Sequence, residues 1–182
     1  SNRVSSSDAA GTVRDLIVGD FVNWGAEARY LKRYSINDNR SAFLIGAKYY
    51  QSKNTGLQGP GSSGSDANFN LANNEFPFYA NQSDYTFPNL NLAVFGENIF
   101  KISSNFSITP GFRFEKIRTQ AEGYYRKINL DLAGNVILDE NQQENNVKDR
   151  NFVLLGVGLS YKPQNQIEFY GNVSQNYRSV TF

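Results

Sequence analysis

The 182-residue chain contains no cysteine and no histidine. Without cysteine it has no disulfides, no thiolate nucleophile and no cysteine-ligated zinc or iron–sulfur site. Without histidine it lacks serine-type catalytic triads, histidine-ligated metals and imidazole acid–base catalysis. We therefore expect a protein that is not an enzyme and that has no cofactor or metal site. Methionine is absent as well, and we expect the chain to be a piece of a longer protein.

The chain also lacks a strong net charge and long hydrophobic runs. It has 18 Lys and Arg against 17 Asp and Glu, which argues against a nucleic-acid partner held by a basic field. No run approaches the roughly 18 apolar residues of a transmembrane helix. Aromatic residues reach 14%, and asparagine is frequent while helix-forming residues are scarce. This composition predicts an all-β protein.

Apolar and polar residues alternate over several long stretches. In Gln166–Tyr177, for example, Ile167, Phe169 and Val173 occupy odd positions, whereas Glu168 and Asn172 occupy even ones. Alternation at period two is typical of strands with one apolar and one polar face. Comparable stretches are Val22–Tyr30, Ser41–Gln51, Asn89–Ile102, Asn105–Glu115 and Phe152–Lys162. We predict an antiparallel meander of about six long strands.

The connections between these stretches alternate in length. Ile36–Arg40, Ser103–Asn105 and Pro163–Asn165 are short and contain turn residues. Two long polar insertions lie between them, at about 55–88 and 119–150, and we expect the second to hold its own hairpin, 124–131 with 136–142. Short turns at one end and long loops at the other are typical of outer-membrane barrels.

Two environments explain a strand with one apolar face. The chain is either a self-contained soluble β-protein, such as a β-sandwich or lipocalin-like ligand binder, or a segment of a large transmembrane β-barrel. The predicted strands exceed the usual length of about 5–6 residues, and aromatic residues lie beside the short turns, as an interfacial girdle requires. These aromatics are Tyr34, Phe43, Phe100, Phe106, Tyr161 and Phe169. The terminal Phe182 keeps a small complete barrel open, although six strands fall short of the eight of known membrane barrels.

Two stretches resemble hairpins of a known family. Residues 91–115 read NLAVFGENIFKISSNFSITPGFRFE, and residues 158–178 read GLSYKPQNQIEFYGNVSQNYR. Both are similar to barrel hairpins of TonB-dependent outer-membrane receptors, and within that family the sequence looks most like the ferric-citrate-type siderophore receptors. The resemblance implies a barrel of about 22 strands around a separate N-terminal plug. Residues 1–182 then form a single barrel segment, with no counterpart of the plug or the TonB box.

The resemblance also implies a function. The segment is expected to belong to an active transporter in the outer membrane of a Gram-negative bacterium, importing a ferric siderophore, ferric citrate or another scarce nutrient. Outer-membrane lipid surrounds such a barrel, and a TonB-type energy-transducing protein contacts the missing N-terminal part.

Several charged residues are expected to lie along the cargo path. The predicted strand phase points Glu27, Arg29, Arg113 and Glu115 inward, and it places Arg118 near the extracellular mouth. Guanidinium groups offer planar, charge-assisted hydrogen bonds to an anionic iron chelate. The ligand or lumen candidates are therefore Arg29, Arg113, Glu115 and Arg118. The alternative is that these are ordinary solvated lumen charges that pair with one another or with the plug.

The isolated chain is expected to self-associate. Six consecutive strands cannot close a wide barrel, so the edge strands near 21–34 and 167–177 lose their neighbours. Open edges expose unpaired backbone groups, and the former lipid face exposes apolar side chains to water. We also expect the two long loops to be the least ordered parts.

Overall fold

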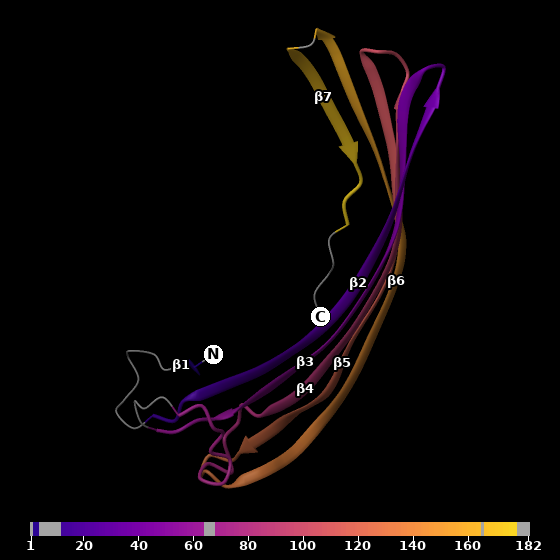
Figure 1. Cartoon of the computed structure of the whole chain (residues 1–182). Coiled ribbons are helices and arrows are strands. Elements are labelled where there is room, and N and C mark those ends of the chain that lie inside the picture. The colour runs from indigo at the N-terminus through magenta and orange to yellow at the C-terminus, as the bar shows by residue number, and fades with distance from the viewer. Residues whose placement is uncertain (1, 4–11, 64–67, 165, 178–182) are drawn as a thin grey trace. The chain divides into compact units, whose positions relative to one another are not determined.

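The computed structural model describes residues 2–3, 12–63, 68–164 and 166–177. This part of the chain contains strands and no helix, and therefore no helix that could cross a membrane. The strands are β1 (Asn2–Arg3), β2 (Asp15–Ile36), β3 (Asn39–Pro60), β4 (Ser83–Lys101), β5 (Phe106–Leu130), β6 (Val136–Gln164) and β7 (Ile167–Ser174). They form one sheet in sequential order (Figure 1). The prediction of an all-β antiparallel meander of six long strands is confirmed.

The connection between β2 and β3 is a two-residue turn. Asn37 and Asp38 have φ angles of 46° and 63°, the left-handed region that both central residues of a type I′ turn require. Asparagine and aspartate tolerate this region better than other residues with a side chain. The turn therefore joins two 22-residue strands directly, as its sequence predicts.

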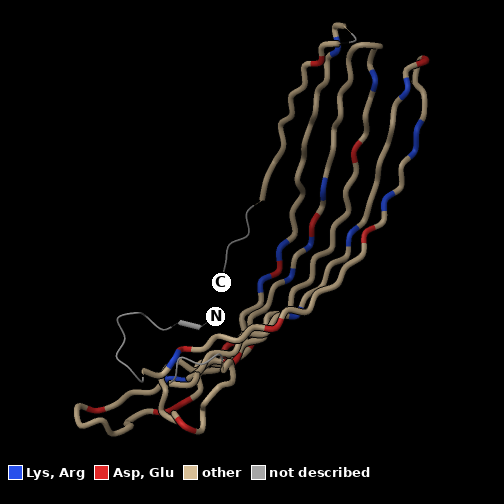
Figure 2. Tube along the Cα trace, turned by 60° about the vertical axis from the view of Figure 1, so that its left-hand side comes forward, with Lys and Arg blue, Asp and Glu red and all other residues tan. Residues whose placement is uncertain are grey.

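The chain divides into two compact units. The first consists of Ser1–Asn23, Ser52–Asn89 and Thr119–Lys148, and the second consists of Trp24–Gln51, Leu90–Arg118 and Asp149–Phe182. The second unit contains the three short turns and the alternating stretches. The first unit contains the strand ends that are joined by residues 61–82 and 131–135. Charged residues are scattered along the strands, as Figure 2 shows.

In the second unit, register separates an apolar from a polar face. Val157 lies opposite Val173, and Tyr161 lies opposite Phe169, so these four side chains share one face. Glu168 accepts a hydrogen bond from Ser160 on the other face, at 2.6 Å. The predicted assignment of β6 and β7 is therefore confirmed. On the apolar face Phe169 is 63% exposed and Leu155 is 55% exposed.

The first unit corrects the prediction of a long loop at 119–150. β5 continues to Leu130 and β6 begins at Val136, so most of this range is strand. The predicted hairpin exists, but it is the far end of β5 and β6 rather than a separate element. Asp131 closes the turn by accepting backbone hydrogen bonds from Ala133 and Asn135. Backbone ladders form whatever the polarity of the side chains, so polar composition did not indicate a loop here.

The first predicted loop is also shorter than expected, because β3 reaches Pro60 and β4 begins at Ser83. Its described residues are hydrogen-bonded at both ends. Near the start, the amide of Ala72 donates to the carbonyl oxygen of Pro60 at 2.7 Å. Near the end, the amide of Arg126 on β5 donates to the carbonyl oxygen of Gln82 at 2.8 Å. The connection is thus attached to the strands beside it.

The Arg126 side chain adds a further attachment. Its Nε and Nη2 donate to the two carboxylate oxygens of Asp139 on β6, at 2.7 and 2.6 Å. Its Nη1 donates to the carbonyl oxygen of Pro77. The hydrogen bonds from Arg126 hold the pKa of the Asp139 carboxyl below its usual value. The carboxylate therefore orients the guanidinium that is hydrogen-bonded to the segment between β3 and β4.

Few hydrophobic side chains are buried in the described part of the chain. They are Leu16, Ala93 and Ala121. Phe182, considered above as a terminal aromatic, lies outside the described residues. A single sheet layer with so small a core does not correspond to the soluble β-sandwich that the sequence left open.

Acidification is expected to weaken the Arg126–Asp139 pair. Because the pKa of Asp139 is lower in the folded than in the unfolded chain, the pair stabilises the fold above the unfolded pKa. This stabilisation is lost as pH falls through the folded pKa. Thermal unfolding of the unsubstituted chain and of Asp139→Asn is followed by circular dichroism in detergent, from about pH 5 to about pH 2. The difference in stability between the two proteins measures the contribution of the pair. The difference between the two proteins should shrink with falling pH, and a constant difference contradicts the assignment.

Without detergent, the isolated chain is expected to assemble into dimers or larger species. β7 is an edge strand, and beside β2 the described chain places only the two-residue β1. Every residue of β7 is exposed, so both its backbone edge and its apolar face are open to a second copy. Light scattering at several concentrations measures the assembly. A monomer at all concentrations that also fails to bind a hydrophobic dye contradicts this expectation.

Candidate functional site

An aromatic ring on the polar face of the second unit lies close to two guanidinium groups. The ring belongs to Phe95 on β4. The Cζ atom of Arg29 on β2 is 5.7 Å from the ring centroid, and the Cζ atom of Arg113 on β5 is 5.4 Å from it. Both distances are within the range of cation–π attraction. Three strands thus contribute to one cluster, here called the Phe95 cluster: Glu27, Arg29, Asn91, Phe95, Arg113 and Glu115.

Each arginine of the Phe95 cluster also pairs with a carboxylate two residues away on its own strand. Arg29 forms an ion pair with Glu27, and Arg113 forms one with Glu115. Residues two apart on a strand share a face, so the alternation that the sequence shows brings each pair together. Asn91 on β4 donates from Nδ2 to the second carboxylate oxygen of Glu115, at 3.2 Å. The Oδ1 atom of Asn91 is buried and has no hydrogen-bond partner.

Gly46 on β3 makes room for the Phe95 ring. A Cβ atom at position 46 would lie 2.5 Å from Cζ of Phe95 and 3.0 Å from the carbonyl oxygen of Ala28. Any side chain there would therefore displace the ring. Beside the ring is an open hollow of about 300 Å³, which Arg29, Arg113 and Glu97 also line.

The cluster presents positive groups that remain accessible. The side chain of Arg29 is 62% exposed and that of Arg113 is 34% exposed, whereas that of Glu115 is 13% exposed. Exposed ion pairs contribute about 0–1 kcal/mol, so a solute anion can replace Glu27 as the partner of Arg29 at small cost. A guanidinium binds a carboxylate through two parallel hydrogen bonds. The arrangement is therefore suited to binding an anionic solute next to an aromatic ring.

The structure brings three of the four predicted candidates together. Arg29, Arg113 and Glu115 share the Phe95 cluster, as the strand phase predicts. Arg118 does not join them. Along β5, Phe114, Lys116 and Arg118 alternate with Arg113 and Glu115 and are exposed, so Arg118 lies on the apolar face. Parity along β5 thus separates Arg118 from the other three candidates.

Sequence reasoning missed Phe95 and the role of Gly46. A usable sign was present, because Phe95 occupies an odd position on β4, and the odd positions 89, 91, 97 and 101 of this strand are polar, although 93 and 99 are not. An aromatic residue on a polar face indicates a specific local partner. In the described part of the chain, no group of three or more acidic side chains could hold a metal ion.

Comparison with known proteins identifies the family. A sequence model for the family described as TonB dependent receptor-like, beta-barrel, matches residues 2–182. The chain belongs to this family. No curated protein matches it significantly.

Membership in the TonB-dependent receptor family accounts for the single sheet. The chain's meander is consistent with a fragment of such a barrel, and the family consists of transporters rather than enzymes. Its members lie in the outer membrane of Gram-negative bacteria and carry out TonB-dependent transport of nutrients. In barrels of this kind the apolar face contacts lipid and the polar face lines the lumen. The Phe95 cluster is on the polar face.

Replacing Gly46 with alanine is expected to destabilise the fold. The new methyl group would push the Phe95 ring away from both guanidinium groups, and overpacking of this kind costs about 1–3 kcal/mol. The matched control is Gly171→Ala on β7, where a Cβ atom meets nothing within 4 Å. It should change stability by less than about 0.5 kcal/mol. Denaturant unfolding in detergent measures both variants, and equal stability of the two contradicts the role of Gly46.

Proposed function

We propose that this barrel segment contributes a binding surface for an anionic iron chelate, such as ferric citrate or a ferric siderophore, which the complete receptor imports with TonB energy coupling. The observation that carries the proposal is the pair of guanidinium groups within cation–π distance of the Phe95 ring. Carboxylate-bearing chelates have the charge and the planar oxygen pairs that guanidinium groups bind. Another scarce anionic nutrient is the alternative cargo.

The dimensions of the second unit support a position within the bilayer. On β2, Trp24 and Tyr34 lie on the apolar face by alternation and are separated by ten residue steps of about 3.3 Å. At the usual barrel tilt of about 35–45°, this length corresponds to a height of about 25 Å, the height of the apolar band of membrane barrels. The face between them carries Ala26, Ala28 and Tyr30, followed by Lys32 next to the Tyr34 end, where a lysine side chain can reach the headgroup level. Aromatic residues at both ends of the band are typical of the two bilayer interfaces.

Within such a band, the Phe95 cluster faces the lumen. A charge on the lipid side at mid-membrane costs about 2–4 kcal/mol, so the location of Arg29 and Arg113 on the polar side agrees with a water-filled path. Glu27 and Glu115 balance the charges of Arg29 and Arg113. An arriving chelate replaces Glu27 as partner of Arg29, and the weakness of such an exposed contact also permits its release.

The test is uptake of radiolabelled ferric citrate by cells that lack the encoding gene and are complemented with variants of the complete protein. The double substitution Arg29→Gln and Arg113→Gln should raise the concentration for half-maximal uptake roughly tenfold to a hundredfold, since a hydrogen bond to a charged group contributes about 1.5–3 kcal/mol. A matched control is Lys32→Gln, which removes one positive charge from the apolar face of β2.

Two results would contradict the proposal. If deletion of the gene leaves uptake of ferric citrate and of other anionic chelates intact, the cargo is wrong. If deletion abolishes uptake but the double variant transports normally, the cargo stands and the Phe95 cluster is not its binding surface. A neutral chelate offered to the same cells distinguishes recognition of charge from loss of transport, because its uptake should not change in the double variant.

A further inference from the structure

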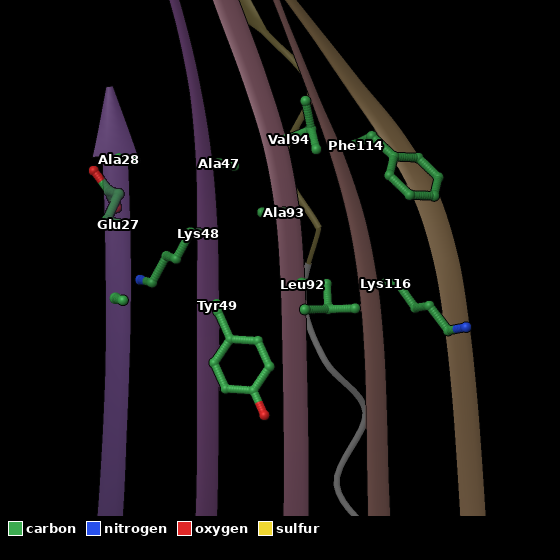
Figure 3. Close-up of a pocket in the computed structure, with 11 residues that line it drawn as sticks. Glu27, Ala28, Ala47, Lys48, Tyr49, Leu92, Ala93, Val94, Phe114 and Lys116 are labelled. Atoms are coloured by element: carbon green, nitrogen blue, oxygen red, sulfur yellow. The ribbon is translucent and has the colours of Figure 1, made fainter. Parts of the chain in front are cut away.

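The apolar face of the second unit is not smooth. It contains an open hollow of about 580 Å³, within the range of about 300–1,000 Å³ typical of sites for small molecules. Small side chains form its floor: Ala26 and Ala28 on β2, and Ala47 on β3. Larger residues on three neighbouring strands border it, namely Tyr49, Leu92 and Phe114 (Figure 3). The lining is almost entirely apolar, so the hollow fits a hydrocarbon chain.

One side of the hollow carries positive charge. Lys116 on β5 borders it, and Arg118 follows two residues later on the same face. Both side chains are exposed, and neither makes an ion pair within the described part of the chain. Glu27 also borders the hollow, but its carboxylate pairs with Arg29 on the opposite face. The accessible charge at this rim is therefore cationic.

An aromatic pair indicates the depth of this rim in the bilayer. The rings of Trp24 and Tyr49 have centroids 4.8 Å apart, and Tyr49 borders the hollow. Tryptophan and tyrosine at the end of an apolar band lie at the level of lipid headgroups. Cationic side chains on a lipid-facing surface are tolerated at this level, where phosphate groups are their natural partners.

We propose that the hollow binds one acyl chain of a membrane lipid whose anionic phosphate headgroup is held by Lys116 and Arg118. The inference rests on the membrane-spanning position of the proposed function, but not on the cargo. The shape accounts for the acyl chain, because three alanines leave space that larger side chains enclose. The charge accounts for the headgroup, since guanidinium and ammonium groups are the usual ligands of phosphate.

Trp24 makes the proposal measurable, because it is the only tryptophan of the chain. The chain is reconstituted in phosphatidylcholine vesicles that contain a fixed fraction of lipid with brominated acyl chains, either phosphatidic acid or phosphatidylcholine. Bromine quenches tryptophan fluorescence on contact. Brominated phosphatidic acid should quench Trp24 more strongly than brominated phosphatidylcholine. Lys116→Gln and Arg118→Gln should each reduce this preference roughly fivefold, the effect of one cationic residue near an anionic lipid surface.

Two variants serve as controls. Lys162→Gln removes the same charge from the opposite face, where Lys162 pairs with Glu168, and should leave the preference unchanged. Lys116→Arg keeps the positive charge and should retain the preference for brominated phosphatidic acid. Equal quenching by the two brominated lipids, or a preference that survives in the Lys116→Gln and Arg118→Gln double variant, overturns the lipid site alone. Absence of quenching by both lipids contradicts the membrane position and, with it, the lipid site.

Discussion

The structure depends on one constraint: a single layer of antiparallel strands cannot bury its own apolar face. Backbone N–H and C=O groups are satisfied within the ladder, but the side chains of that face need a cover. The described residues bury hydrophobic side chains only at Leu16, Ala93 and Ala121, while Trp24 is 58% exposed. Burial of a large apolar side chain contributes about 1.5–3 kcal/mol, so a cover over this face stabilises the sheet strongly. For a member of the TonB-dependent receptor family, lipid provides that cover.

The same alternation that exposes one face to lipid concentrates charge on the other. Arg29 and Arg113 are far apart in the sequence, on β2 and β5. The two strands that lie between these in the sheet, β3 and β4, carry Gly46 and Phe95. The glycine leaves room, the ring fills it, and both guanidinium groups lie within cation–π distance of the ring. The small residue therefore allows the large one. The anion-binding role proposed for the cluster depends on this arrangement.

Local patterns predicted most of the fold and part of the site. The turn at Asn37 and Asp38 and the faces of β6 and β7 are as expected, because turn chemistry and period-two alternation involve only near neighbours. The expectation of a long loop at 119–150 did not anticipate that β5 and β6 continue through most of this range. Polar residues occur on both faces of the strands there, so a clean alternation is missing while the backbone ladder continues. Arg118 lies apart from the other three candidates, since parity decides its face and proximity to Arg113 along the chain does not.

By itself, the sequence determined the all-β class, the long strands, the tight turns and the division of residues between two faces, because each follows from interactions between residues close in the chain. Only the tertiary structure decided which strands place their side chains opposite one another. Phe95 meets Arg29 and Arg113, and Lys116 borders a hollow floored by alanines of β2 and β3, because cross-strand register is set by turn geometry and by packing across the whole sheet. No local pattern carries that information.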